Sequence, residues 1–316
     1  MTDLQPAVST VVRRSLGVQP GEAVVVVVDP ATRAIGDALR DEAAAAGADA
    51  VLMVMDERAT HGTEPPGPVA AAMAASDVFI APTTKSLSHT DARKRAVDGG
   101  ARGATMPGVT EDMLARVMAV DLDAMAARSR AVAAVLERGT AARVTCPRGT
   151  DLRVAIDGRA GIADDGEFTA PGAFGNLPSG EGFVSPVFGE GTVVPASLAS
   201  LGLSLDPVHL TVAEGRLVAA DGGLGPEFIE LLLAHGKDGT NLAELGVGTN
   251  DRARLTGNIL EDEKILGTVH VAFGASAGIG GTVSVPIHLD VVIAEATLEV
   301  DGQRVLDAGR YVLGPQ

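Results

Sequence analysis

The sequence predicts an α/β plus α+β fold, with a doubly wound parallel-sheet domain over 1–140 and a β-rich domain over 141–316. Three observations support this prediction. The length of 316 residues suits two domains of roughly 100–200 residues each. Up to residue 140, runs that are apolar on both strand faces alternate with helical segments, which is typical of a parallel sheet covered by helices. Beyond that point the apolar runs become short and alternating, and glycine or proline interrupts them.

The elements of the first domain are predicted in chain order. The β-branched run 24–28 ends at Asp29-Pro30, and the alanine-rich segment 31–46 is predicted to be a helix closed by Gly47. A helix over 123–138 leads into the second domain. Three further apolar runs complete a small parallel sheet, at 50–55, 77–80 and 103–106.

The second domain is predicted to consist largely of hairpins. Segment 141–145 is a strand that ends in the turn 147–150, and 208–213 pairs with 216–220 around a glycine turn. One helix is predicted in this half, over 226–235. No glycine-rich nucleotide-binding motif follows a predicted strand, so neither a dinucleotide site nor a P-loop is expected.

Composition excludes several classes of function. The chain carries 25 Lys and Arg against 41 Asp and Glu, a net charge of −16, with 3% aromatic residues, so nucleic acid is not expected as a partner. The single cysteine, Cys146, excludes a disulfide framework and a cysteine-based zinc site. No signal sequence is visible, and no apolar run approaches the ~18 residues of a membrane span. We therefore expect a soluble, cytoplasmic protein that acts on a small molecule or a peptide.

Two histidines and three acids lie among apolar strands of the second domain. His288 and Asp290 are two residues apart in a predicted strand, so both project from one face and could bind one metal ion. His270, on a neighbouring strand, could complete a set of two histidines and one carboxylate. Glu181 and Glu244 would bring the donors to five, enough for two divalent ions that share a carboxylate. The alternative is that His288 and Asp290 are a hydrogen-bonded pair, because so short a motif often arises by chance.

Several ordered segments resemble the aminopeptidase T family of metallopeptidases. The similarity extends over most of the chain and is carried by NLPSGE (176–181), NLAELGVGTN (241–250), EDEKILGTVH (261–270) and PIHLD (286–290), together with SHTDAR (88–93), GARGATMPG (100–108) and 147–152. The resemblance implies an N-terminal α/β domain, a C-terminal β-rich domain that carries the metal ions, and a homodimer. It also implies that the metal ligands are Glu181, Glu244, His270, His288 and Asp290.

Two departures from that family bear on the reaction. Its peptidases carry a tyrosine seven residues after the first histidine ligand, and Ala277 occupies this position here. The stretch from Asp262 to His270 is also two residues longer than is usual in the family. Because a phenol could stabilise a tetrahedral intermediate, its absence weakens the case for peptide hydrolysis.

The sequence also resembles the 2,5-dihydroxypyridine dioxygenases, which are similar to aminopeptidase T but bind one ferrous ion. This resemblance implies a ligand set of His270, His288 and Asp290. The presence of Glu181 and Glu244 favours two metal ions and hydrolysis, whereas the absence of the tyrosine favours the dioxygenase.

Three hypotheses follow. The first is a metal-dependent hydrolase that cleaves an aminoacyl, peptide or other small amide bond, with Zn, Co or Mn activating a water molecule and Glu244 bridging the ions. In this hydrolase, Glu181 or Glu263 would transfer protons. The second is a ring-cleaving dioxygenase with one Fe(II). The third is a non-catalytic relative that keeps the fold as a binding module.

Overall fold

The computed structural model describes residues 3–314, which form two compact units. Unit 1 consists of 3–120 and 166–179, and unit 2 consists of 121–165 and 180–314. The chain therefore passes from unit 1 to unit 2, returns once, and leaves again before Glu181. No helix among the described residues is long and apolar enough to cross a membrane.

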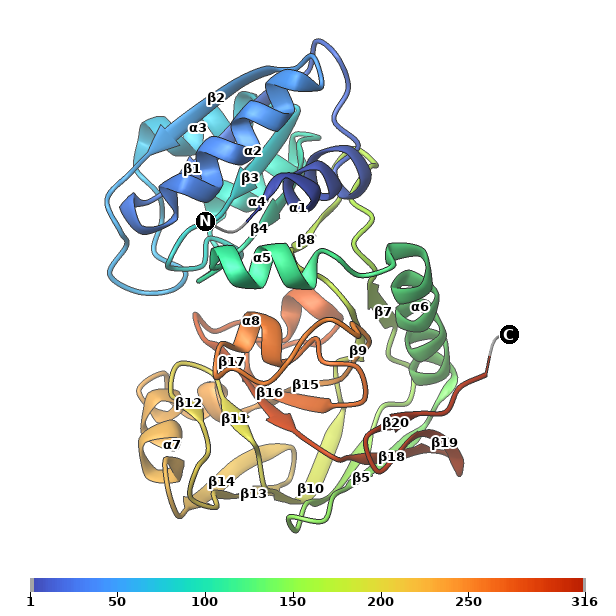
Figure 1. Cartoon of the computed structure of the whole chain (residues 1–316). Coiled ribbons are helices and arrows are strands. Elements are labelled where there is room, and N and C mark those ends of the chain that lie inside the picture. The colour runs from blue at the N-terminus through green and yellow to red at the C-terminus, as the bar shows by residue number, and fades with distance from the viewer. Residues whose placement is uncertain (1–2, 315–316) are drawn as a thin grey trace. The chain divides into compact units, whose positions relative to one another are not determined.

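Unit 1 contains the predicted parallel sheet (Figure 1). Its strand order is β2-β1-β3-β4-β8, and every neighbouring pair is parallel. The strands are β1 (Ala23–Val28), β2 (Asp49–Val54), β3 (Val78–Ala81), β4 (Arg102–Thr105) and β8 (Phe174–Asn176). The first four confirm the predicted strands. β8 comes from the returning segment, and its three residues are too short for a local pattern to reveal.

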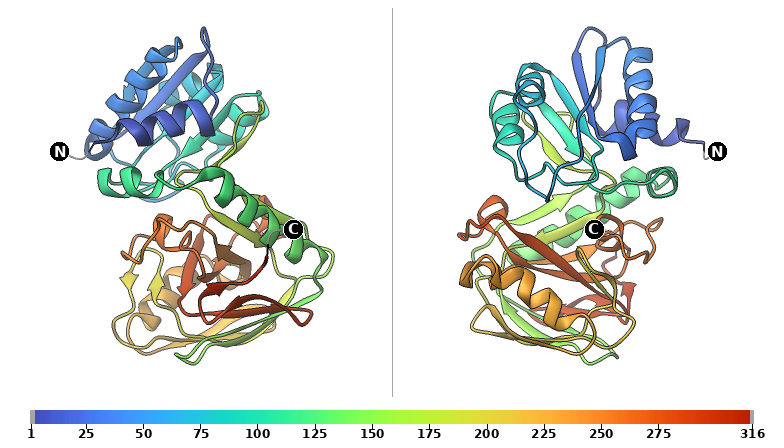
Figure 2. Two further views of the ribbon diagram at one scale, coloured as in Figure 1. Left: turned by 45° about the vertical axis from the view of Figure 1, so that its right-hand side comes forward. Right: turned by 90° about the vertical axis from the view of Figure 1, so that its left-hand side faces the viewer.

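Helices cover both faces of this sheet (Figure 2). Val25 and Val27 of β1 face a core shared with α3 and α4, whereas Val28 lies against α2, where a Cβ on Gly36 would be 2.3 Å from Val28 Cγ1. Gly47 follows α2 with φ +92°, which confirms the predicted end of that helix. The helices are α1 (Gln5–Ser9), the π-helix Thr10–Ser15, the 3-10 helix Pro30–Thr32, α2 (Arg33–Ala45), α3 (Gly67–Ala75), α4 (Asp91–Asp98) and α5 (Glu111–Val117).

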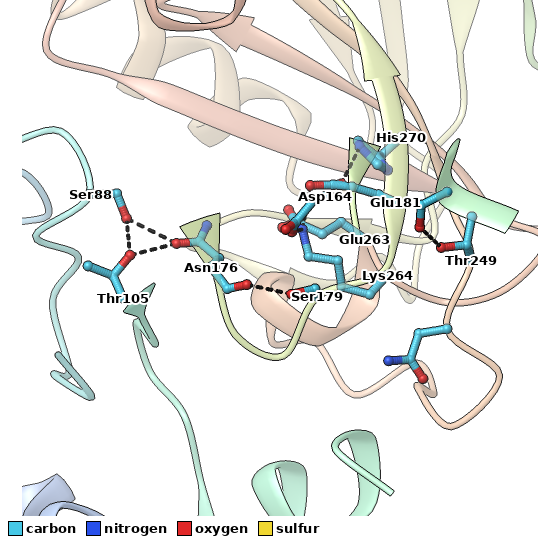
Figure 3. Close-up of polar contacts among 12 residues, drawn as sticks. Ser88, Thr105, Asp164, Asn176, Ser179, Glu181, Thr249, Glu263, Lys264 and His270 are labelled. Carbon is cyan, nitrogen blue, oxygen red and sulfur yellow. Dashed lines mark hydrogen bonds and ion pairs between the residues drawn. The ribbon is translucent and has the colours of Figure 1, made fainter. Parts of the chain in front are cut away.

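Three of the segments that resemble known families meet at the carboxyl ends of β4 and β8. The Ser88 and Thr105 hydroxyls lie 2.7 Å apart, and Asn176 Oδ1 accepts hydrogen bonds from Thr105 at 2.6 Å and Ser88 at 3.2 Å (Figure 3). These three side chains are far apart in the sequence but form one hydrogen-bonded triangle. It joins the returning segment to the sheet of unit 1.

Unit 2 is built around two sheets. One has the order β14-β13-β10-β6-β5-β18-β19-β20 and the other β12-β11-β17-β16-β15-β9-β7. The first comprises β5 (Ala141–Thr145), β6 (Asp151–Ala155), β10 (Phe188–Val193), β13 (His209–Ala213), β14 (Arg216–Asp221), β18 (Thr297–Val300), β19 (Gln303–Asp307) and β20 (Arg310–Tyr311). The second comprises β7 (Gly161–Asp164), β9 (Glu181–Val184), β11 (Ser197–Leu198), β12 (Gly202–Leu203), β15 (Leu242–Gly248), β16 (Val269–Gly274) and β17 (His288–Ile293).

A single apolar core joins the two sheets of unit 2. Alternate residues of β16, Val269, Val271 and Phe273, point into it, so His270 points to the opposite face of the seven-stranded sheet. The Phe273 ring meets Phe228 edge to face at 6.2 Å. The helices of this unit are α6 (Leu122–Arg138), α7 (Gly225–Leu233), α8 (Ile259–Asp262) and the 3-10 helices Lys237–Thr240 and Ala277–Ile279.

The two units divide the chain differently from a boundary near residue 140. Helix α6 packs on β7 and β9 and buries Val132, Val135 and Leu136 in the core of unit 2. Segment 166–179 adds β8 to the sheet of unit 1. Local periodicity marks a helix or a strand but not the core in which it is buried, which is why the sequence misplaces both segments.

Candidate metal centre

The predicted donors lie on one face of the seven-stranded sheet, the face turned away from the core. Glu181 of β9 pairs with Gly248, and His270 of β16 pairs with Gly246, both on β15. Paired residues in an antiparallel sheet share a face, as do alternate residues along one strand. Glu181, Glu244 and His270 therefore point to the same side. Glu181 is the first residue of β9.

Strand β17 brings the two remaining donors to this face. Asp290 pairs with Ala272, and His288 pairs with Gly274, both on β16. Ala272 and Gly274 alternate with His270, so all three β16 residues lie on the donor face. The prediction that His288 and Asp290 share a face, with His270 on a neighbouring strand, is confirmed.

Two glycines of β15 leave room for the side chains and backbone that pack on the donor face. A Cβ on Gly246 would lie 2.0 Å from His270 Nε2, so only glycine at this position leaves room for the His270 ring. A Cβ on Gly248 would lie 2.1 Å from the Ile265 carbonyl oxygen. Glycine there allows the segment after α8 to approach the sheet, with the Asn250 amide donating to the Lys264 carbonyl at 2.9 Å.

The donors form two groups that share Glu244. The inner group is Glu181, Glu244 and His270, and the outer group is Glu244, His288 and Asp290; within each, one donor atom per residue lies within 4.8 Å of the others. Among residues 3–314, no such group contains both histidines. The set of His270, His288 and Asp290 that the dioxygenase resemblance implies is therefore not one donor group.

The outer group could hold a metal ion, and a backbone carbonyl orients its histidine. His288 Nδ1 lies 2.7 Å from the Ala275 carbonyl oxygen, so the ring donates through Nδ1 and turns Nε2 toward the carboxylates. Nε2 is 3.4 Å from Glu244 Oε2 and 3.7 Å from Asp290 Oδ2. A histidine that binds a metal through one nitrogen usually donates the other N–H to a carbonyl or carboxylate, which fixes the tautomer.

The inner group is arranged differently. His270 Nε2 lies 3.0 Å from Glu181 Oε2 and 3.2 Å from Glu244 Oε1, and only the second contact has hydrogen-bond geometry. His270 Nδ1 has no hydrogen-bond partner among the described residues, so no carbonyl orients this ring. The His270 side chain is fully buried.

A buried lysine lies beside the inner group (Figure 3). Lys264 Nζ is 2.6 Å from Glu181 Oε1, 2.7 Å from Glu263 Oε1 and 3.5 Å from Asp164 Oδ2, and its side chain is 1% exposed. Its segment is anchored by Asp262, which accepts hydrogen bonds from the Ser197 hydroxyl and from two backbone amides. Glu263 belongs to neither donor group and pairs with Lys264 instead.

The carboxylates shift the protonation of both histidines. Burial acts to lower the pKa of His270, but Glu181 and Glu244 outweigh it and hold the pKa well above its ordinary value. Burial acts to lower the pKa of His288 as well, and Asp290 and Glu244 raise it well above the ordinary range. Burial acts to raise the pKa of Glu244, but its contacts with the two histidines outweigh burial and hold that pKa below its ordinary value. The site therefore attracts positive charge, which protons or a metal ion can supply.

The acids around Lys264 differ in the direction in which their pKa values are shifted. Burial raises the pKa of Asp164 to about 7 and that of Glu263 to about 8, with Lys264 opposing the shift in both. For Glu181, burial also acts to raise the pKa, but Lys264 and His270 outweigh it and lower it. Of the two acids predicted to transfer protons, Glu263 is thus the one that holds a proton near neutral pH.

The comparisons with known proteins agree with this architecture. A family model described as NicX, 2,5-dihydroxypyridine 5,6-dioxygenase, matches residues 4–313. The chain belongs to the NicX family. The 2,5-dihydroxypyridine 5,6-dioxygenase of Pseudomonas putida is 22% identical over 258 residues, which cover 76% of this chain and 72% of that protein.

Two solved structures share the fold of this NicX family chain. 2,5-Dihydroxypyridine dioxygenase from Pseudomonas putida KT2440 has a TM-score of 0.83 at 19% identity and covers 98% of this chain and 97% of its own. Wild-type AmpT (aminopeptidase T) from Thermus thermophilus has a TM-score of 0.71 at 20% identity and covers 98% of this chain and 99% of its own. The predicted resemblance to the dioxygenases is thus confirmed as family membership. The predicted resemblance to aminopeptidase T is confirmed for the fold.

Sequence reasoning did not single out Lys264 or Asp164 in this member of the NicX family. Asp164 ends strand β7, where it pairs with Glu181. One signal was present, because Lys264 is the only cation in the acidic run 261–264 and lies directly before apolar residues. A lysine in that position must either reach solvent or find buried carboxylates.

Proposed function

We propose that the chain is a metal-dependent, ring-cleaving dioxygenase that binds one ferrous ion at the outer group, with Glu244, His288 and Asp290 as ligands. The observation that carries the metal site is the orientation of His288 by the Ala275 carbonyl. Membership of the NicX family supports the reaction class. The proposed substrate is a hydroxylated nitrogen heterocycle or a related hydroxylated aromatic ring.

The outer donor set fits a divalent transition metal. One imidazole nitrogen and two carboxylates suit Fe(II), Mn(II) or Zn(II). The donor separations of 3.4 and 3.7 Å are longer than a good hydrogen bond and suit ligands arranged around a common ion. The His288 and Asp290 side chains are 15% and 13% exposed, whereas His270 is fully buried. The outer group is therefore the more accessible of the two.

The protein's own residues have distinct roles in this proposal. A bound ferrous ion would supply open coordination positions and redox chemistry toward dioxygen and the ring. Glu244 and Asp290 supply negative charge, and His288 is held in one tautomer. Glu263, with a pKa raised by burial to about 8, holds a proton at neutral pH and is the proposed proton donor.

A second candidate is a two-ion hydrolase of small amide bonds. Two observations favour it: Glu244 belongs to both donor groups, and Glu181 Oε2 is buried without a hydrogen bond. Two ions bridged by Glu244 would activate water and polarise a carbonyl. Ala277 lies in the short 3-10 helix before β17, so no phenol is available at the position where the family's peptidases carry one.

Metal content and oxygen uptake test the first candidate. Protein purified anaerobically without a metal-binding tag would be loaded with Fe(II), desalted and analysed by elemental mass spectrometry. We expect about one iron per chain and oxygen consumption on addition of 2,5-dihydroxypyridine. Two Zn or Mn ions per chain, with hydrolysis of aminoacyl amides and no oxygen uptake, would support the second candidate instead.

A matched pair of histidine variants locates the ion. His288→Gln removes a proposed ligand, whereas His235→Gln alters an exposed histidine after α7. We expect His288→Gln to weaken iron binding by roughly 100-fold and His235→Gln to match the wild type. Equal iron content in both variants, with native circular dichroism, would show that the ion is held elsewhere.

A further inference from the structure

Lys264 places a fixed positive charge beside the inner group. Its ammonium lies 2.6 Å from Glu181 Oε1 and is enclosed by two further acids, Glu263 and Asp164. The side chain is 1% exposed, so water cannot screen this charge as it would at the surface. One oxygen of the inner group is therefore already paired with a cation.

A divalent ion in the inner group would have to share Glu181 with this ammonium. Both cations would compete for the same carboxylate, and their mutual repulsion would act in a region of low effective dielectric. His270 Nε2 already lies 3.2 Å from Glu244 Oε1 with hydrogen-bond geometry and 3.0 Å from Glu181 Oε2, so an ion here would also have to displace the histidine proton. The outer group contains no lysine contact of this kind among the described residues.

We propose that Lys264 is a built-in counter-ion of the inner group and keeps the centre at one metal ion. The residue thereby sets the metal stoichiometry, and with it the choice between one-ion and two-ion chemistry on the same five donors. This inference rests on the proposed function in one respect, since it takes the outer group to hold the first ion. It assigns no catalytic step to Lys264.

The inference predicts that removal of the charge opens a second site. In Lys264→Met a side chain of similar length replaces the ammonium, and Glu181, Glu244 and His270 become free to bind an ion. We expect one Mn²⁺ per chain in the wild type and two in Lys264→Met, with affinity for the second ion increased by roughly 100-fold or more. Lys94→Met removes an exposed lysine of α4 and should behave as the wild type.

The measurement is a Mn²⁺ titration by calorimetry, with the bound metal counted after dialysis. Electron paramagnetic resonance gives an independent readout, because an isolated Mn²⁺ and a pair bridged by a carboxylate have different spectra. Lys264→Met exposes three carboxylates to mutual repulsion and could fail to fold. The double variant Asp164→Asn, Lys264→Met keeps the net charge of the cluster and is the second protein to test.

The outcomes separate this inference from the proposed function. One ion in the wild type and two in a folded variant support the inference. One ion in the wild type and in both folded variants overturns it and leaves the outer site standing. Two coupled ions in the wild type overturn the inference and favour the hydrolase. No bound Mn²⁺ in any of the proteins overturns both proposals.

Discussion

Replacing Gly246 by alanine tests whether the centre depends on space left on the sheet face. The added Cβ would lie 2.0 Å from His270 Nε2, 2.4 Å from Cε1 and 2.8 Å from Cδ2. Ordinary contact begins near 3.4 Å, so the ring must move by more than an ångström. It has no open space to move into, because His270 is fully buried. The substitution therefore separates His270 from Glu244 and Glu181.

The expected loss in the free energy of unfolding is the sum of two contributions. Overpacking a well-packed site costs roughly 1–3 kcal/mol, and loss of a buried hydrogen bond to a charged group costs roughly 1.5–3 kcal/mol. Their sum is about 2.5–6 kcal/mol. For a unit of this size each kcal/mol lowers Tm by about 2–4 °C. We expect Gly246→Ala to lower the Tm of the metal-free protein by roughly 10 °C.

Thermal unfolding followed by circular dichroism measures this effect. Gly67→Ala is the matched control, because a Cβ on Gly67 meets nothing within 4 Å. The metal affinity of the outer group should also fall in Gly246→Ala, since Glu244 loses its contact with His270. A Tm for Gly246→Ala within about 2 °C of the control, with unchanged metal affinity, would refute the packing argument.

Two further predictions concern the pH dependence of metal binding and the stability of unit 1. Burial acts to lower the pKa of His288, but Asp290 and Glu244 outweigh it and raise that pKa above its ordinary value. Because protons and metal ions compete for this imidazole, metal affinity should rise with pH between about 6 and 9. Calorimetry in buffers of different ionisation enthalpy should detect proton release, and constant affinity over this range would contradict the prediction. Arg102→Met should destabilise unit 1 by roughly 3–5 kcal/mol, because Arg102 donates two bonds to Glu22 and one to the Leu16 carbonyl. Urea unfolding measures the loss, and metal content per folded chain should remain that of the wild type.

The sequence was sufficient to predict those helices, strands and turns that are determined by residues close together in the chain. The run of five valines in β1 is buried on both sides, and the glycine after α2 has the positive φ that a helix end of this type requires. The hairpin of β13 and β14 and helix α7 lie within a residue or two of the predicted ranges. These features depend on residues close together in the chain, so their physics can be read locally.

The arrangement of the site depends on long-range register and could not be read in the same way. Between Leu242 and Glu244 the pairing of β15 with β16 shifts by one residue, and such a bulge changes which side chains face one another. Five donors could be named from the sequence. Their division into two groups, with Glu244 shared and the two histidines in different groups, depends on that register. Lys264 reaches Glu181 across 83 residues of chain, and no local rule anticipates this pair.

One signal in the sequence was nevertheless sufficient to mark the donor face. A central strand buried on both sides normally carries large apolar residues on both faces. In β15 one face has Leu245 and Val247 in the core, while the other has Glu244 followed by two alternate glycines. In β16 His270 is likewise followed by a small residue at each alternate position. A charged or ligating residue followed by small residues at the second and fourth positions leaves room for side chains from neighbouring strands. The same pattern on two adjacent strands therefore predicts a polar centre rather than an apolar core.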